Sequence, residues 1–228
     1  MDSHRLASVK RSLAFVSLVL AGCGSPERAG MTASDARAMI ASYIPASVTD
    51  RDGWATDIHT AVAVLKIPVT PDNICAVVAI TEQESGFRAD PAIPNLPSIA
   101  WAEIERRREK VGVPKFALDA ALSIKSTNGR TYRERIDAAR TERDLSETFE
   151  DMIGRVPLGR RFFEDRNPVR TAGPMQVSVA FAREHAQAKP YPYPVIETLR
   201  DEVFTRRGGM YFGIAHLLDY PAGYDRYI

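Results

Sequence analysis

Two acidic residues near the end of one apolar stretch, Glu82 and Glu84, are the first candidates for chemistry in this 228-residue chain. On a helix that begins at Pro71, the apolar side chains form a single stripe of Ile74, Val77, Val78 and Thr81. Glu84 continues this stripe one turn later, just before Gly86 lets the chain turn. A carboxyl group held there is expected to be partly desolvated and therefore to keep its proton near neutral pH, as a catalytic acid must. Glu82 lies on the other flank of the stripe, so spacing alone does not choose between the two acids.

The segment around Glu84 resembles the catalytic segment of lytic transglycosylases, the lysozyme-like enzymes that cleave peptidoglycan. It reads Ile80-Thr81-Glu82-Gln83-Glu84-Ser85-Gly86-Phe87, and in that family an apolar helix ends in Gln-Glu-Ser-x-Phe. By position, the resemblance makes Glu84 the catalytic acid and Ser85 its hydrogen-bonding neighbour.

A second segment resembles the Gly-Leu-Met-Gln motif with which the same family lines its sugar groove. It reads Ala172-Gly173-Pro174-Met175-Gln176-Val177-Ser178, with Pro174 in place of the usual Leu. The resemblance implies that Gly173, Met175 and Gln176, together with Ser85 of the first segment, help to bind substrate. Both motifs occur in the order that the family requires, and the whole chain resembles uncharacterised bacterial lipoproteins that carry a transglycosylase-like domain.

The resemblance implies a lysozyme-like transglycosylase fold and cleavage of the bond between N-acetylmuramic acid and N-acetylglucosamine. Glu84 would protonate the glycosidic oxygen, and its carboxylate would then activate the muramyl C6 hydroxyl to give a 1,6-anhydro end. This reaction needs one acid and consumes no water. Asp90 and Glu82 lie nearby in the sequence and keep a hydrolytic, lysozyme-like outcome open.

The spacing of the two motifs departs from the family pattern. Glu84 and Gly173 are 89 positions apart, whereas a short loop usually joins these motifs. Residues from about 98 to 170 are therefore expected to be a helical insertion, and the part from 101 to 170 carries 16 basic and 13 acidic residues. It could grip glycan strands, contact a cell-wall protein partner or merely decorate the fold. Its Arg106-Arg107-Arg108 run is most simply a solvated helix face.

The family's third motif, Ala-Tyr-Asn-Ala-Gly or similar, supplies a tyrosine that supports the catalytic glutamate. Here the sequence ends at Tyr224-Asp225-Arg226-Tyr227-Ile228, soon after the helix that normally precedes that motif. We expect a truncated C-terminus, and otherwise Tyr224 or Tyr227 as a poor substitute. The missing motif leaves one rival interpretation, a non-catalytic lipoprotein of the envelope that binds peptidoglycan or scaffolds other proteins.

The first 22 residues have the pattern of a secretory signal peptide. A basic start is followed by an apolar run of about eleven residues, which is too short to cross a bilayer. The run ends in Leu20-Ala21-Gly22-Cys23, which resembles the bacterial lipobox and predicts lipidation of Cys23, with residues 23–33 as a tether. A lipid anchor would hold the protein on a membrane, and Gly24 favours the outer membrane, facing the periplasm.

The remaining sequence predicts a mainly α-helical domain over residues 34–228 and no substantial sheet. Helices are expected near residues 34–43, 52–66, 71–85, 98–111, 114–124, 130–140, 144–153, 177–188, 196–206 and 209–219. A formal net charge of +1 argues against nucleic acid as a partner. His59, His185 and His216 form no metal-ligand pattern, so neither a metal nor a cofactor is expected. Cys75, amid apolar neighbours, is expected to be a small buried residue.

Overall fold

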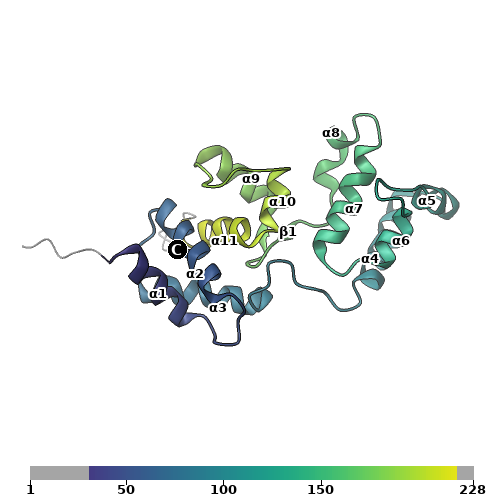
Figure 1. Ribbon diagram of the computed structural model, residues 1–228. Coiled ribbons are helices and arrows are strands. Elements are labelled where there is room, and N and C mark those ends of the chain that lie inside the picture. Colours follow the sequence, from purple (N-terminus) through teal and green to yellow (C-terminus); the bar gives the residue numbers. More distant parts are fainter. Residues whose placement is uncertain (1–30, 220–228) are drawn as a thin grey trace, which may run out of the picture. The chain divides into compact units, whose positions relative to one another are not determined.

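The computed structural model describes residues 31–219 (Figure 1). Residues 33–219 belong to one compact unit. The expected signal peptide, Cys23 and most of the tether lie outside the described residues, as do Tyr224 and Tyr227.

Eleven α-helices account for most of the described residues, which confirms the mainly α-helical class. They are α1 (Ala33–Tyr43), α2 (Arg51–Val64), α3 (Pro71–Ser85), α4 (Leu96–Val111), α5 (Lys115–Leu122), α6 (Tyr132–Asp137), α7 (Glu142–Gly154), α8 (Gly159–Phe163), α9 (Val179–Ala188), α10 (Leu199–Val203) and α11 (Arg206–Ile214). A 3₁₀ helix, η1 (Glu164–Arg166), follows α8, and a π-helix, η2 (Ala215–Asp219), follows α11. In this part of the chain the one sheet is an antiparallel pair, β1 (Thr171–Ala172) and β2 (Val177–Ser178).

Local sequence explains where α3 begins and ends. The Thr70 side chain accepts a hydrogen bond from the backbone N–H of Asn73 (3.3 Å), and Pro71 occupies the first turn, where no backbone donor is needed. At the other end, Gly86 takes the left-handed conformation (φ 57°) that stops the helix. The boundaries expected from the sequence are confirmed for this helix.

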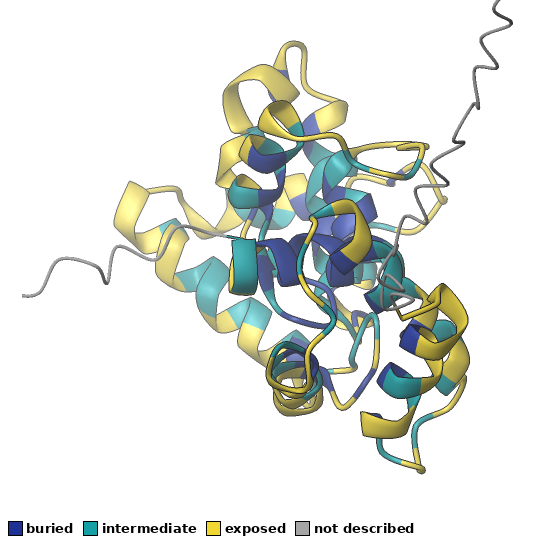
Figure 2. Ribbon diagram, turned by 90° about the vertical axis from the view of Figure 1, so that its left-hand side faces the viewer, coloured by how far each residue is buried: buried dark blue, intermediate teal, exposed yellow. Residues whose placement is uncertain are grey.

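The body of the unit is built around α11. Every residue from Gly208 to Ile214 is buried, and α2, α9, α10 and the β-hairpin all pack against this helix. Buried residues, dark blue in Figure 2, gather in the interior and leave the outward faces of the helices exposed. The larger apolar core draws its side chains from both sides of the charged segment, and its largest members are Ile40, Ile44, Trp54, Ile58, Ile74, Phe87, Met175, Phe204, Met210, Tyr211, Phe212 and Ile214.

The residues between the two motifs fold as α4–α8, which we call the insertion. Its own core is small and consists of three buried side chains, Leu122, Tyr132 and Ile136, with half-buried neighbours. Arg106 and Arg107 are exposed, as expected, and both pair with Glu103 on the same helix, but Arg108 is half-buried and pairs with Glu105. Local ion pairs of this kind are typical of helices that face solvent.

Two expectations about burial and extent are wrong. Cys75 is exposed, because it follows the buried Ile74 by one position and therefore points about 100° away around the α3 axis. The helix expected at 196–206 is shorter and covers only Leu199–Val203, with Thr198 as its N-cap. Within residues 31–219, no helix has the length and apolarity needed to cross a bilayer.

Candidate functional site

Glu84 lies in the last turn of α3, and its side chain is exposed to solvent. The buried face of α3 consists of Ile74, Val77, Thr81 and Ser85. Since successive residues of a helix are about 100° apart around its axis, Glu84 falls beside this face rather than on it. The expected desolvation of the Glu84 carboxyl is therefore wrong for the free protein. Among the described residues, its side chain makes no hydrogen bond or ion pair.

Ser85, the neighbour of Glu84, is buried, and its hydroxyl is used within the turn that ends α3. Ser85 Oγ donates to the carbonyl oxygen of Thr81 (3.0 Å) and accepts from the backbone N–H of Arg88 (3.4 Å). Arg88 Nε in turn donates to the carbonyl oxygen of Ser85 (3.0 Å). Ser85 thus fixes the direction in which the chain leaves Glu84.

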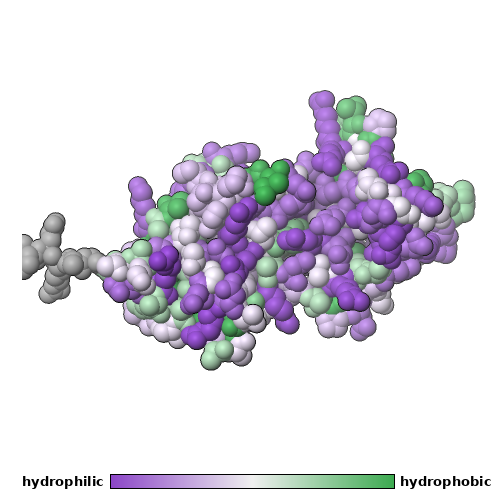
Figure 3. Space-filling view, in the orientation of Figure 1, coloured by the Kyte–Doolittle hydropathy of each residue, from purple (hydrophilic) through white to green (hydrophobic). Residues whose placement is uncertain are grey.

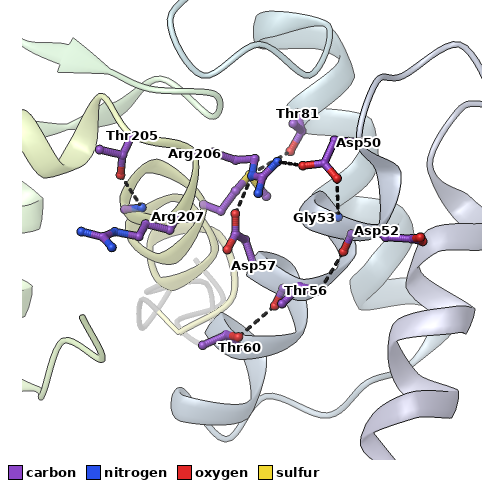
Figure 4. A network of polar contacts seen from close by, with 12 residues as sticks. Asp50, Asp52, Gly53, Thr56, Asp57, Thr60, Thr81, Thr205, Arg206 and Arg207 are labelled. Atoms are coloured by element: carbon purple, nitrogen blue, oxygen red, sulfur yellow. Dashed lines mark hydrogen bonds and ion pairs between the residues drawn. The ribbon is translucent and has the colours of Figure 1, made fainter. Parts of the chain in front are cut away.

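An aromatic pair and an ion-pair cluster hold the turn that follows α3, and Figure 4 shows the ion pairs of Arg206 with Asp50 and Asp57. The ring of Phe87 packs edge-on against Trp54 at 5.2 Å. The Arg206 guanidinium lies 5.4 Å from the Trp54 ring centroid and is 2.6 Å from a carboxylate oxygen of both Asp50 and Asp57. The hydrogen bond from Arg206 lowers the pKa of Asp50. The cluster joins α2 to α11, and Trp54 of α2 in turn contacts Phe87 in the turn after α3.

An open cavity of about 440 Å³ lies beside this cluster. Its lining combines an indole, a carboxylate and two guanidinium groups, which come from Trp54, Asp57, Ala89, Thr205, Arg206 and Arg207. Groups of these kinds can hold a polar ligand such as a sugar by hydrogen bonds. Ala89 brings this cavity within five positions of Glu84.

The second motif forms the tight turn between β1 and β2. Gly173 has φ 77°, and a Cβ atom there would lie 2.3 Å from the carbonyl oxygen of Val203, so only glycine fits. Pro174 and Met175 pack directly on two glycines of α11, where Cβ atoms would approach them to 2.3 and 2.6 Å. Gly173 and Met175 are buried by this packing, and of the four residues expected to bind substrate only Gln176 is half-exposed, because Ser85 is buried as well.

The side chain of Gln176 connects the hairpin to the insertion. Its Oε1 accepts from the hydroxyl of Thr171 (2.9 Å), and its Nε2 donates to a carboxylate oxygen of Glu142 (3.2 Å). Glu142 is the first residue of α7 and lies 34 positions before Gln176. Sequence reasoning missed both partners of Gln176. The only local signal is the capping box of Thr141 and Asp144, which marks the start of a helix but not what Glu142 contacts.

Glu142 and Asp90 form a carboxyl pair beside Gln176. Burial raises the pKa of Glu142, and the charge of Asp90 raises it further, against the hydrogen bond from Gln176. Burial also raises the pKa of Asp90, against its hydrogen bond with Thr141 and the charge of Arg143, which lies 3.7 Å away. Both acids are partly desolvated, whereas Glu84 is exposed.

The structure brings the two motifs onto the same helix. Thr81 of α3 contacts Met210, with its hydroxyl 3.8 Å from the Met210 sulfur, and the hairpin packs on Gly209 and Gly213. Within residues 31–219 no hydrogen bond or ion pair joins Glu84 to Gln176. The motifs are therefore related through α11 rather than by direct contact.

The insertion contains a larger and apolar cavity of about 610 Å³. One face of α4 and one face of α7 line it along most of their lengths, from Leu96 to Val111 and from Glu142 to Met152. Its apolar walls do not suit a sugar. At one end it reaches Thr171 and Glu142, both of which also touch Gln176. In the described part of the chain, no three His, Cys, Asp or Glu residues are arranged to hold a metal ion.

Taken together, the chain is a mainly α-helical protein in which the charged helices α4–α8 lie in the sequence between two motifs that pack on one central helix. Residues 47–228 match the family described as "Protein of unknown function (DUF1615)", and the chain belongs to that family. It is 50% identical over 212 residues to the protein named "Uncharacterized protein YaiW" of Escherichia coli (strain K12), a match that covers 91% of this chain and 58% of that protein. The chain thus spans less than two thirds of this relative. No solved structure matches it.

Proposed function

We propose that this protein is a peptidoglycan lytic transglycosylase-like enzyme with a lysozyme-like domain and Glu84 as its single catalytic acid. One observation carries the proposal. The helix that ends in Glu84 and the hairpin that presents Gln176 pack against the same segment of α11, between Gly209 and Gly213. That arrangement supports a glycan groove with the acid at one side and the amide of Gln176 at the other.

In this proposal the reaction uses one carboxyl group. Glu84 donates its proton to the glycosidic oxygen between N-acetylmuramic acid and N-acetylglucosamine as the bond to the muramyl C1 breaks. The Glu84 carboxylate then takes the proton of the muramyl C6 hydroxyl, and O6 closes on C1. The products are a free N-acetylglucosamine hydroxyl and a 1,6-anhydro-muramyl end, and no water is consumed.

The glycan itself supplies the environment that Glu84 lacks in the free protein. Glu84 is exposed, whereas a proton donor works best when water is excluded. A sugar seated over the end of α3 covers the carboxyl and favours its neutral form.

The other residues of the two motifs have different tasks. Gln176 is the one whose amide can reach an N-acetyl group or a sugar hydroxyl, because Ser85, Gly173 and Met175 are buried. Those three hold the backbone of the groove in place. The hydrogen bond from Gln176 to Glu142 orients the amide before substrate binds.

We also propose that Cys23 carries a lipid, which holds the enzyme on a membrane of the cell envelope. Of the two membranes we favour the outer one, with the protein facing the periplasm. Peptidoglycan strands then lie within reach of the tethered domain. The insertion over residues 101–170 is a candidate surface for a cell-wall protein partner.

The test is digestion of purified peptidoglycan sacculi by the chain from residue 23 onward, with Cys23 replaced by Ser. Mass spectrometry of the released fragments should find ends that are one water lighter than hydrolysed muropeptides. Glu84→Gln should abolish their release, and the matched control Glu82→Gln, another exposed acid on α3, should not. Full activity of Glu84→Gln would refute the proposal, and unmodified reducing ends would make the protein a hydrolase with a second carboxylate.

The exposure of Glu84 favours one alternative, a non-catalytic lipoprotein that binds peptidoglycan or scaffolds other envelope proteins. A binding protein needs no desolvated acid, and the buried hairpin could serve it equally well. In the same experiment, intact sacculi that retain both the parent chain and Glu84→Gln would establish this alternative.

A further inference from the structure

The segment from the end of α7 through η1 exposes several large apolar side chains. We call residues 155–166 the α8 tip. Four of its large apolar side chains are exposed, with Val156 at 48%, Leu158 at 63%, Phe162 at 64% and Phe163 at 46% of their full area. Figure 3 shows apolar green beside hydrophilic purple where Figure 1 places α8. Grouped apolar side chains on a surface usually mark a binding site.

The backbone of the α8 tip holds these side chains outward. Gly159 is buried, and a Cβ atom there would lie 2.1 Å from the carbonyl oxygen of Ile153 and 2.9 Å from the Val156 Cβ atom. The start of α8 is thus pressed against the end of α7. Leu158, just before it, adopts φ 59°, a left-handed conformation that side chains disfavour. A leucine kept in that conformation and left largely exposed adds little to the core, which points to a role for its side chain outside the fold.

Unpaired arginines surround the apolar side chains. The four arginines of the α8 tip are all exposed, and none forms an ion pair with a described residue; they are Arg155, Arg160, Arg161 and Arg166. Both acids of the tip, Glu164 and Asp165, are engaged by Arg183 of α9. Elsewhere in the insertion the arginines on α4, α6 and α7 are mostly paired with carboxylates, as Arg106, Arg107, Arg108, Arg133, Arg135 and Arg143 are. The α8 tip therefore presents free positive charge together with apolar area.

We propose that the α8 tip docks on the surface of a membrane that contains anionic phospholipids. Phe162, Phe163 and Leu158 enter the headgroup region, where side chains with aromatic rings gain most from burial, and the arginines bind the lipid phosphates. The exposed aliphatic side chains of Val156 and Leu158, which lie beside the two rings in this segment, suit a lipid surface better than a glycan strand. The inference does not rest on the proposed catalytic function, because it concerns a surface on the far end of α7 from Glu142.

The test measures sedimentation of the chain from residue 23 onward, with Cys23 replaced by Ser, together with phospholipid vesicles. Vesicles of phosphatidylglycerol and phosphatidylethanolamine should bind the protein, and vesicles of phosphatidylcholine alone should bind it at least tenfold more weakly. The double variant Phe162→Ser/Phe163→Ser should lower binding by roughly tenfold or more, since each exposed ring contributes buried area. Arg160→Gln/Arg161→Gln should lower it by roughly 25-fold at low salt, at about fivefold per charge near an anionic surface.

Matched controls come from the same insertion. Phe116→Ser removes a side chain that is 76% exposed on α5, and Arg106→Gln/Arg107→Gln removes two ion-paired charges on α4. Both controls should bind vesicles like the parent chain, and circular dichroism should show the same fold for every variant because the replaced side chains are exposed. Unchanged binding of the tip variants, or equal losses in the controls, would overturn the proposal. Loss of binding to sacculi but not to vesicles would assign the surface to a glycan and overturn it as well.

Discussion

The body and the insertion are both helical, but different interactions hold them together. The body closes around α11, where glycines let the hairpin approach the helix to contact distance, and its main ion-pair cluster joins residues 149 and 156 positions apart. The insertion has three buried side chains in its core and ion pairs three or four positions apart on α4, together with the pairs Arg135–Asp151 and Arg133–Asp119, which join its helices over 16 and 14 positions. Close packing between residues that are far apart in the sequence fixes the positions of their side chains tightly. Exposed ion pairs within one helix contribute little to the free energy of folding. The proposed site accordingly rests on the body.

The largest effect is expected from adding one methyl group at a glycine of the body. Gly173→Ala places a Cβ atom 2.3 Å from the carbonyl oxygen of Val203 and keeps φ at 77°, so the hairpin must shift. We expect a loss of about 3 kcal/mol or more in the free energy of unfolding, measured by urea denaturation. Gly129→Ala is the matched variant in the insertion, with φ 83° but nothing within 4 Å, and should cost only about 1 kcal/mol. Equal losses would contradict the distinction between the two regions.

Arginine variants compare the two kinds of ion pair. Arg206→Ala leaves Asp50 and Asp57 without their common partner and removes the cation over the Trp54 ring. A loss of about 2 kcal/mol is expected from thermal unfolding. Arg106→Ala breaks an exposed pair on α4 and should leave the melting temperature unchanged. If Arg106→Ala were as costly as Arg206→Ala, the insertion would owe more to its ion pairs than we infer.

The smallest effect concerns Glu142 and depends on pH. Its folded-state pKa is raised by burial and by Asp90, so the folded state holds a proton more tightly than the unfolded state. Stability is then lost as pH rises from the ordinary glutamate value toward the raised one. Glu142→Gln keeps a side-chain acceptor for Gln176 and should increase stability modestly at neutral pH, with no gain at pH values low enough to protonate Glu142 in both states. A gain that is independent of pH would show that the charge is not its cause.

Features set by neighbouring residues could be predicted from the sequence, and features set by distant residues could not. The first and last residues of α3 follow from Thr70, Pro71 and Gly86, which lie in this helix or directly beside it, and the structure confirms them. The pairing of Gln176 with Glu142 spans 34 positions and depends on where the insertion places α7, which no local pattern encodes.

The side-chain directions on α3 show a finer limit. A helical wheel places Glu84 and Ser85 near one apolar stripe, but in the structure Thr81, which contacts Met210 of α11, and Ser85 are buried, whereas Glu84 is exposed. Cys75 is likewise exposed next to the buried Ile74. The sequence predicts the apolar stripe of α3 to within one residue. Which edge of that stripe is buried depends on how α3 packs against α11.

One helix connects the two surfaces that matter most in these proposals. α7 begins with Glu142, which holds Gln176, and ends at the α8 tip. Along the way Leu145 packs on the larger core and Met152 on the smaller one. A 13-residue helix about 20 Å long behaves as a stiff rod, so a tilt imposed at one end displaces the other. If docking of the α8 tip tilts α7, the hydrogen bond between Gln176 and Glu142 changes with it. By reciprocity, a glycan bound at Gln176 then changes the affinity of the tip for its membrane by the same factor.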